Sequence, residues 1–137
     1  MTPITPTEVL VTGEATGPLV ISPAPLSFWG GYDAATGEVI DRRHPLSGRC
    51  LTGCVLALPW TRGSSTTTAI LLEAVRLGTA PAAILLPKVD TFIALASIVA
   101  HELYGRGFVV AVVPADTLTD LDGRPVSIAG TAASDPQ

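Results

Sequence analysis

Between residues 64 and 113 the chain alternates segments of helical character with short apolar runs. Ser64–Leu77 has apolar residues at helical spacing, Val89–Tyr104 is predicted as a second helix, and a glycine follows each segment. Ala82–Leu86 and Phe108–Val113 are apolar runs typical of buried strands. Strand–helix–strand units are connected by right-handed crossovers between parallel strands. This part of the chain is therefore predicted to form an α/β layer with parallel pairing.

The first 60 residues differ in composition and pattern, because they are rich in glycine, proline and short apolar runs. Strands are expected at Glu8–Thr12, Leu19–Ser22, Leu26–Trp29 and Val55–Leu58, with a turn at Gly13–Pro18 between the first two. Several short strands separated by turn signals suggest a small barrel or sandwich.

No linker separates these two parts of the chain, so one domain is predicted over residues 1–130. The last residues, 131–137, are small and polar and are expected to form a flexible tail. Before that tail, a helical turn is expected at Asp116–Leu121 and a last strand at Pro125–Ala129.

Charged residues make up 15% of the chain, and the 12 acidic residues outnumber the 8 basic ones. Nucleic-acid binders carry a basic footprint, so no nucleic-acid partner is expected. Apolar runs stay well below the ~18 residues of a membrane span, and no basic region marks a secretion signal at the N-terminus. A cytoplasmic protein is therefore expected, and its low charge suggests that a partner covers part of the surface.

The stretch Trp60–Thr68 lies between a strand that ends at Pro59 and the first predicted helix. Gly63 permits a sharp turn, and Ser64 or Ser65 can cap the helix. A helix N-terminus with unpaired N–H groups binds anions, which makes this loop, including Arg62, a candidate site. The alternative is that the serine is only an N-cap. The loop is not a phosphate-binding Walker A motif.

Arg42, Arg43 and His44 follow Asp41 in a chain with few basic residues. We interpret this cluster as an anion clamp or a contact with a partner. The alternative is a solvated loop in which Asp41 pairs with Arg43, an interaction worth ~0–1 kcal/mol when exposed.

Ser27–Gly31 places Phe28 and Trp29 beside Gly30 and Gly31. Aromatic residues of this kind anchor a core, and we expect this of Phe28. Trp29 belongs either to the core or to an interface. The glycine pair would permit close approach of the backbone to a ligand.

Cys50 and Cys54 are too few for a metal site, because only His44 and His101 could add ligands. No metal is expected to bind this chain. The two cysteines are interpreted as small buried hydrophobic residues. His101, beside Glu102, is interpreted as a surface histidine.

From about Glu8 to Val113, which is most of its length, the chain resembles the small subunit of aconitase X, and five segments carry the resemblance in matching order. They are Gly13–Leu19, Leu26–Asp33, Ile40–Gly48, Arg62–Thr66 and Gly78–Ile84. This resemblance implies the swivelling β/β/α domain of the aconitase family. The fold expected is thus α/β, with a small β-barrel-like half and strand–helix–strand units.

In the wider family the loop Gly-x-Gly-Ser-Ser-Arg carries the catalytic serine as its first serine. The corresponding loop here is Thr61–Thr66, so the resemblance gives that role to Ser64. Thr61 replaces the first glycine and Thr66 replaces the arginine, which puts anion binding by that arginine in doubt. Arg62 would be the substitute cation.

The resemblance implies a hydro-lyase (dehydratase) whose iron–sulfur cluster is held by an aconitase X large subunit, with no cofactor bound by this chain. The substrate expected is a small hydroxy acid, cis-3-hydroxy-L-proline, with phosphomevalonate as the alternative. Because the chain begins at its own Met1, the partner is expected to be a separate chain. The chain alone should be inactive. A non-catalytic swivel or regulatory module and a stand-alone binder of small anions are the competing functions.

Overall fold

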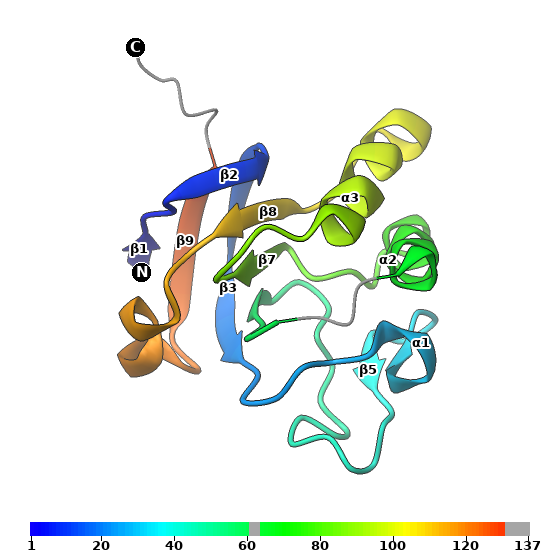
Figure 1. The fold of residues 1–137 in the computed structure, drawn as a ribbon, viewed down its shortest axis with the longest axis horizontal. Helices are drawn as coiled ribbons and strands as arrows, with labels where there is room; N and C mark the ends of the chain where they lie inside the picture. Colours follow the sequence, from blue (N-terminus) through cyan, green and yellow to red (C-terminus); the bar gives the residue numbers. More distant parts are fainter. Residues whose placement is uncertain (61–63, 131–137) are drawn as a thin grey trace.

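The structure is a computed structural model that describes residues 1–60 and 64–130 (Figure 1). In that part, a curled sheet has the order β1-β9-β3-β6-β7-β8-β2, and β4 and β5 form a separate hairpin. The strands are β1 (Thr2–Ile4), β2 (Glu8–Val11), β3 (Gly13–Ile21), β4 (Tyr32–Asp33), β5 (Glu38–Val39), β6 (Val55–Ala57), β7 (Ala83–Leu86), β8 (Val109–Val112) and β9 (Pro125–Gly130). The helices are α1 (Phe28–Gly31), α2 (Ser65–Leu77) and α3 (Thr91–Tyr104), with 3-10 turns η1 (Ala115–Thr117) and η2 (Thr119–Leu121).

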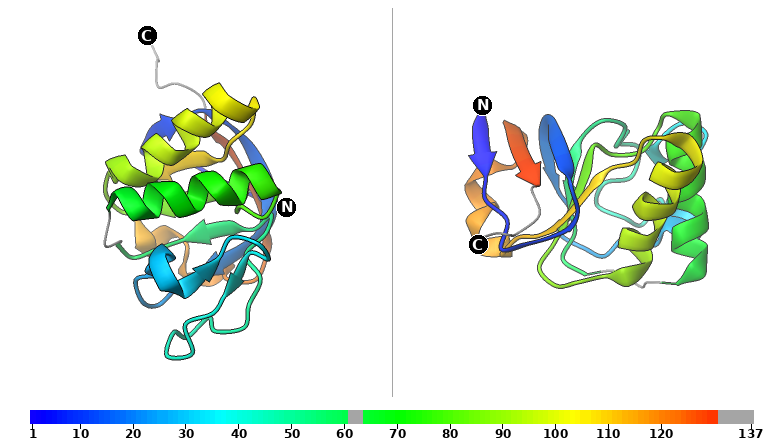
Figure 2. Two further views of the ribbon diagram at one scale, coloured as in Figure 1. Left: turned by 90° about the vertical axis from the view of Figure 1, so that its right-hand side faces the viewer. Right: turned by 90° about the horizontal axis from the view of Figure 1, so that it is seen from above.

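Both predicted long helices are confirmed, and both end at the predicted glycines. Gly78 and Gly105 have φ values of 78° and 70°, the left-handed conformation that suits a helix C-terminus. The two helices pack against one another on one side of the sheet (Figure 2). No helix within the described ranges has the length and apolar character needed to cross a bilayer.

The four central strands β3, β6, β7 and β8 are parallel, as the strand–helix–strand pattern predicts. Their side chains alternate between two buried faces. Leu56 and Ile84 pack under the helices, whereas Val55, Ala83 and Val109 face the opposite side. Burial on both faces explains why these strands read as continuous apolar runs in the sequence.

The sheet curls so that its outer strands cover the face opposite the helices (Figure 2). β9 pairs with β3 in antiparallel fashion and carries β1, while β2 pairs with β8 at the other edge. The curl brings the end of β9 against β8 and β2. A Cβ added to Gly130 would lie 3.0 Å from the side chain of Val109 and 3.3 Å from that of Val9, which shows how close the strands are. The expected α/β fold with a barrel-like half is confirmed.

The predicted turn at Gly13–Pro18 is wrong, because these residues belong to the nine-residue strand β3 and pair with β9. The small residues of this strand allow a neighbouring segment to pack closely against it. A Cβ added to Gly17 would lie 2.5 Å from the carbonyl oxygen of Gly53. Glycine at this position is therefore required by the close approach of two backbone segments.

The predicted strand at Leu26–Trp29 is also wrong, because the chain makes a kinked helical turn at α1. Gly30, with a φ of 80°, interrupts the turn. Phe28 is fully buried and meets Tyr32 edge to face, with ring centroids 5.4 Å apart, which confirms it as a core anchor. Trp29 is 68% exposed, so the alternative that placed it in the core is wrong.

The two cysteines lie at different depths. Cys54 is buried, as expected, and burial raises the pKa of its thiol to about 12. Cys50 is exposed, contrary to the interpretation, and its thiol donates to the hydroxyl of Thr52 at 3.2 Å.

The neighbouring residues Phe28 and Trp29 should differ in their effect on stability. Phe28→Ala should lower the free energy of unfolding by ~3–5 kcal/mol, because it empties a fully buried site. Trp29→Ala should lower it by less than ~1 kcal/mol, because substitutions of exposed side chains are usually mild. Urea denaturation of the isolated chain measures both changes, and equal losses would contradict this packing.

The cysteines should differ in reactivity towards iodoacetamide. At pH 8 the folded chain should be alkylated at Cys50, while Cys54 stays buried and protonated. Mass spectrometry of the labelled peptides measures this selectivity, and unfolding in urea should expose both thiols. Equal labelling of the two cysteines in the folded chain would contradict the burial of Cys54.

Candidate functional site

Ser64 stands immediately before α2, at the edge of the sheet where the parallel strands end. Right-handed crossovers place the start of each following helix at this same edge, so α2 and α3 begin side by side. The hydroxyl of Thr68 in α2 donates to the carbonyl of Phe92 in α3 at 2.9 Å, which links the two first turns. Arg62 and Gly63, predicted members of the site, lie outside the described residues.

The hydroxyl of Ser64 does not cap its own helix. Ser64 occupies the N-cap position with an extended backbone, yet its side chain makes no hydrogen bond to the first-turn amides. Asp90 at the start of α3 provides the contrast, because its carboxylate accepts from the amides of Phe92 at 2.9 Å and Ile93 at 3.1 Å. The alternative that made Ser64 a simple N-cap is therefore not supported by its contacts.

Ser64 instead pairs with the hydroxyl of Thr66, at an oxygen–oxygen distance of 2.9 Å. Ser64 is half-buried, and both Ser65 and Thr66 are exposed. The partial positive charge of the α2 N-terminus is directed to the same region. This arrangement can hold an anionic group near the paired hydroxyls of Ser64 and Thr66.

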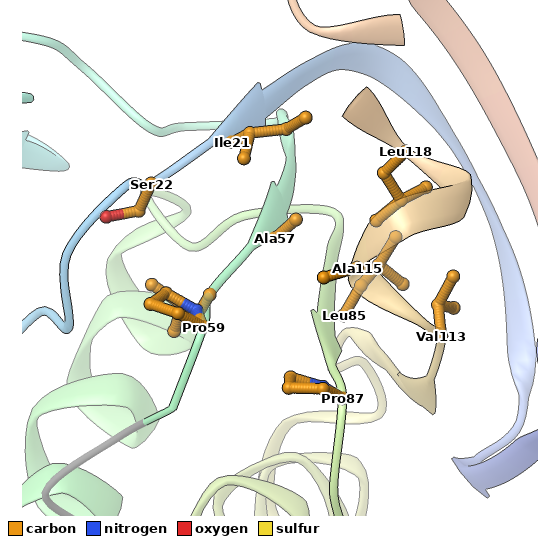
Figure 3. A pocket seen from close by; sticks show the side chains of 10 residues that line it. Ile21, Ser22, Ala57, Pro59, Leu85, Pro87, Val113, Ala115 and Leu118 are labelled. Carbon is orange, nitrogen blue, oxygen red and sulfur yellow. The ribbon is translucent and has the colours of Figure 1, made fainter. Parts of the chain in front are cut away.

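Two hollows share Pro59 and Pro87, which follow β6 and β7 at this edge. The first has a volume of about 70 Å³ and an almost wholly apolar lining drawn from β3, β6, β7, η1 and the residue that follows β8, Val113 (Figure 3). That volume exceeds the ~10–15 Å³ that one water needs. The second, of about 390 Å³, is lined by Trp60, Lys88 and Val89 among others.

Arg42 and Arg43 are exposed, and no carboxylate within the described ranges forms an ion pair with either of them. The Asp41 carboxylate accepts the backbone N–H of Arg43 at 3.0 Å instead. The predicted Asp41–Arg43 ion pair is therefore wrong. Both guanidinium groups are left available for an anion or a partner.

His44 is buried and held within the chain. Its Nδ1 accepts the backbone N–H of Leu46 at 3.0 Å, so the ring proton of the neutral form lies on Nε2. That Nε2 lies 3.3 Å from the carbonyl of Ala24 and 3.4 Å from the hydroxyl of Ser22. These contacts anchor the loop that displays the two arginines, and they do not test the predicted role of His44 in substrate binding or at an interface.

The structure brings the two predicted clusters together. The backbone N–H of Ile40 donates to the carbonyl of Gly31 at 2.9 Å, and a Cβ added to Gly31 would lie 3.6 Å from the Cβ of Asp41. A Cβ on Gly30 would meet no atom within 4 Å, so the backbone there is open to a ligand or partner. α1, which carries Trp29, contacts α2 (Figure 1).

Sequence reasoning missed Trp60, Lys88 and the hydroxyl pair of Thr66 with Ser64. Trp60 is 53% exposed, and Lys88 is exposed beside it at the second hollow. Their positions just after two buried parallel strands are the signal that would have found them, because ligands gather at the carboxyl ends of such strands.

The described residues hold no group of three or more His, Cys, Asp or Glu side chains that could bind a metal ion. His101 is exposed, as interpreted. Metal ligands would have to come from outside the described part of this chain.

The chain matches known proteins over most of its length. A family model described as aconitase X swivel domain matches residues 4–133. The crystal structure of Thermococcus kodakaraensis aconitase X in its holo-form superimposes with a TM-score of 0.75 at 27% identity, covering 90% of this chain and 88% of that chain.

Two curated relatives differ in length. The chain is 55% identical over 104 residues to the cis-3-hydroxy-L-proline dehydratase of Pseudomonas aeruginosa, covering 76% of this chain but only 18% of that relative. It is 41% identical over 93 residues to the phosphomevalonate dehydratase small subunit of Methanothermobacter thermautotrophicus, covering 68% of this chain and 71% of the relative. By the extent of the family match, the chain belongs to the aconitase X swivel domain family.

Proposed function

We propose that this chain is the small, swivelling component of an aconitase X-type hydro-lyase, and that Ser64 is the base that removes the substrate proton. The observation that carries the proposal is the Ser64 hydroxyl, half-buried at the α2 N-terminus and unbonded to the first-turn amides. A serine that does not cap its helix at this position is suited to chemistry, since a serine that stabilised the helix would be bonded to those amides.

The iron–sulfur cluster implied by the family does not fit the described residues, because they contain no metal-binding group of side chains. We therefore assign the cluster to a larger partner, in agreement with relatives that are named small subunits. Both cysteines of this chain are free thiols. Free thiols suit a reducing compartment, and we place the protein in the cytoplasm.

Ser64, ionised to its alkoxide in the complex, would take the proton from the carbon next to the substrate carboxylate and so become the neutral hydroxyl. The helix dipole contributes ~0.3–1 kcal/mol at exposed sites and up to ~2 kcal/mol when partly buried. Since one pKa unit corresponds to about 1.36 kcal/mol, this is far too little for the dipole alone to ionise the serine hydroxyl near neutral pH. The Thr66 hydroxyl lies 2.9 Å from that of Ser64, and either oxygen can be the donor of this hydrogen bond. Further donors or cations must come from the partner, so the chain alone should have no activity.

We propose cis-3-hydroxy-L-proline as the substrate, because the relative with 55% identity carries that name. In this substrate the leaving hydroxyl is on C3 and the proton to be removed is on C2, so loss of water leaves a double bond beside the carboxylate. Phosphomevalonate is the second candidate, supported by the small-subunit relative that has 41% identity. Assay of both compounds with the same complex separates the two.

Ser64 and Ser65 provide a matched pair of variants. In the complex with the large subunit, Ser64→Ala should reduce kcat by at least ~100-fold, because a general base is lost. The exposed Ser65→Ala should stay within a few-fold of the unchanged protein. Steady-state dehydration rates measure both, with co-purification as the control for assembly.

Activity retained by Ser64→Ala would refute its role as the base. A complex that never dehydrates either compound, although it assembles, would favour the non-catalytic module. Substrate binding by the isolated chain would favour the stand-alone anion binder.

Arg43 should act in substrate binding or assembly, because its guanidinium is exposed and unpaired within the described part. Arg43→Ala should raise KM or the Kd for the large subunit by about 5-fold or more, as for the loss of one charge-assisted hydrogen bond. The exposed Arg124, which follows η2, supplies the control variant Arg124→Ala. If both variants behave alike, the Arg42–Arg43 pair is only solvated surface.

A further inference from the structure

Helix α3 is apolar on its inward and its outward side. Its inward residues are buried against the sheet and α2. Its outward side presents an apolar row that we call the α3 outer face, with side chains 39% to 62% exposed: Phe92, Leu95, Ile98 and Leu103. These positions recur at intervals of three to five residues, which keeps them on one side of the helix.

The neighbouring helix α2 shows what a solvated outer face looks like in this protein. It carries Glu73 and Arg76, which form an exposed ion pair at 2.6 Å. By contrast, α3 has no charged residue from Thr91 to Ala100, and the exposed Glu102 stands only in its last turn. A contiguous exposed apolar row marks an interaction surface more often than a solvated one.

We propose that the α3 outer face is the docking surface for the large subunit, an inference that rests on the proposed function. The row begins beside the candidate site. Val89, 51% exposed, lies two residues before α3 and lines the second hollow together with Trp60. The carbonyl of Phe92 accepts the hydroxyl of Thr68, one turn into the helix that Ser64 begins.

A polypeptide that completes the site at Ser64 therefore meets Phe92 next and then Leu95. The occupant we assign is the large subunit, because relatives of this chain are named small subunits. The size of the partner fits as well, because this domain corresponds to only 18% of the length of its longer relative.

The test adds two charges to the face in the intact chain. Leu95→Glu combined with Ile98→Glu should weaken the Kd for the large subunit by about 30-fold or more, as expected when central interface side chains are lost. The control places the same two charges at exposed positions on other elements, Thr119→Glu in η2 and Ala129→Glu in β9. Biolayer interferometry with the purified large subunit measures both, and thermal unfolding of each free variant checks its fold.

A second measurement does not depend on weakening the complex. In a Cys50→Ser background, Ile98→Cys should be labelled rapidly by a maleimide in the free chain and slowed at least about 10-fold in the complex, because interface cores exclude solvent. Equal labelling in both states would overturn the proposed face.

The outcomes separate this inference from the proposed function. If the unchanged chain does not bind the large subunit, the proposed function fails and the docking face fails with it. If the unchanged chain binds and the Leu95 and Ile98 variant binds equally well, only the docking face is overturned. A dimer of the free chain that dissociates in this variant would identify a second copy as the occupant and would also overturn the proposal.

Discussion

The parallel pairing of β6, β7 and β8 is the constraint on which the rest of the molecule depends. Because these strands are added to the sheet in one direction, right-handed crossovers place both connecting helices on the same side and start them at the same edge. That geometry places Ser64, Trp60 and Lys88 at the carboxyl ends of the strands. The barrel-like half covers the opposite face and leaves this edge accessible.

The N-termini of α2 and α3 are capped differently, and this difference supports the proposed role of Ser64. Asp90 caps α3 by accepting two hydrogen bonds from backbone amides, while the Ser64 hydroxyl accepts none from the amides of α2. A serine N-cap bond is worth about 1 kcal/mol, so α2 forgoes a common source of stability. Such local departures from the stabilising pattern are expected at functional sites. The exposed apolar row on α3 is a second departure of this kind.

Where periodicity and stop signals agree, the fold could be predicted from the sequence. The α2 and α3 helices with their terminal glycines, and the buried strands β6 to β8, follow from such signals. Gly13–Pro18 was misread as a turn because the close approach of Gly17 to Gly53 is a tertiary contact. The loop alone marks Ser64 as part of an anion site or as an N-cap, and only the family resemblance gives it the role of base. The Gly31–Asp41 contact could not be predicted, since it depends on how distant segments meet. Lys88 was overlooked, although its place after a buried parallel strand is a sequence signal.

The central claim is that Ser64 faces the substrate and not its own helix. A crystal structure of the complex of this chain with its large subunit and an unreactive analogue of cis-3-hydroxy-L-proline tests this most directly. The account predicts the Ser64 hydroxyl within ~3–3.5 Å of the carbon that loses the proton, the spacing of reacting atoms in a productive complex. An analogue bound elsewhere, with the Ser64 hydroxyl bonded to the amides of Thr66 or Thr67, would contradict it.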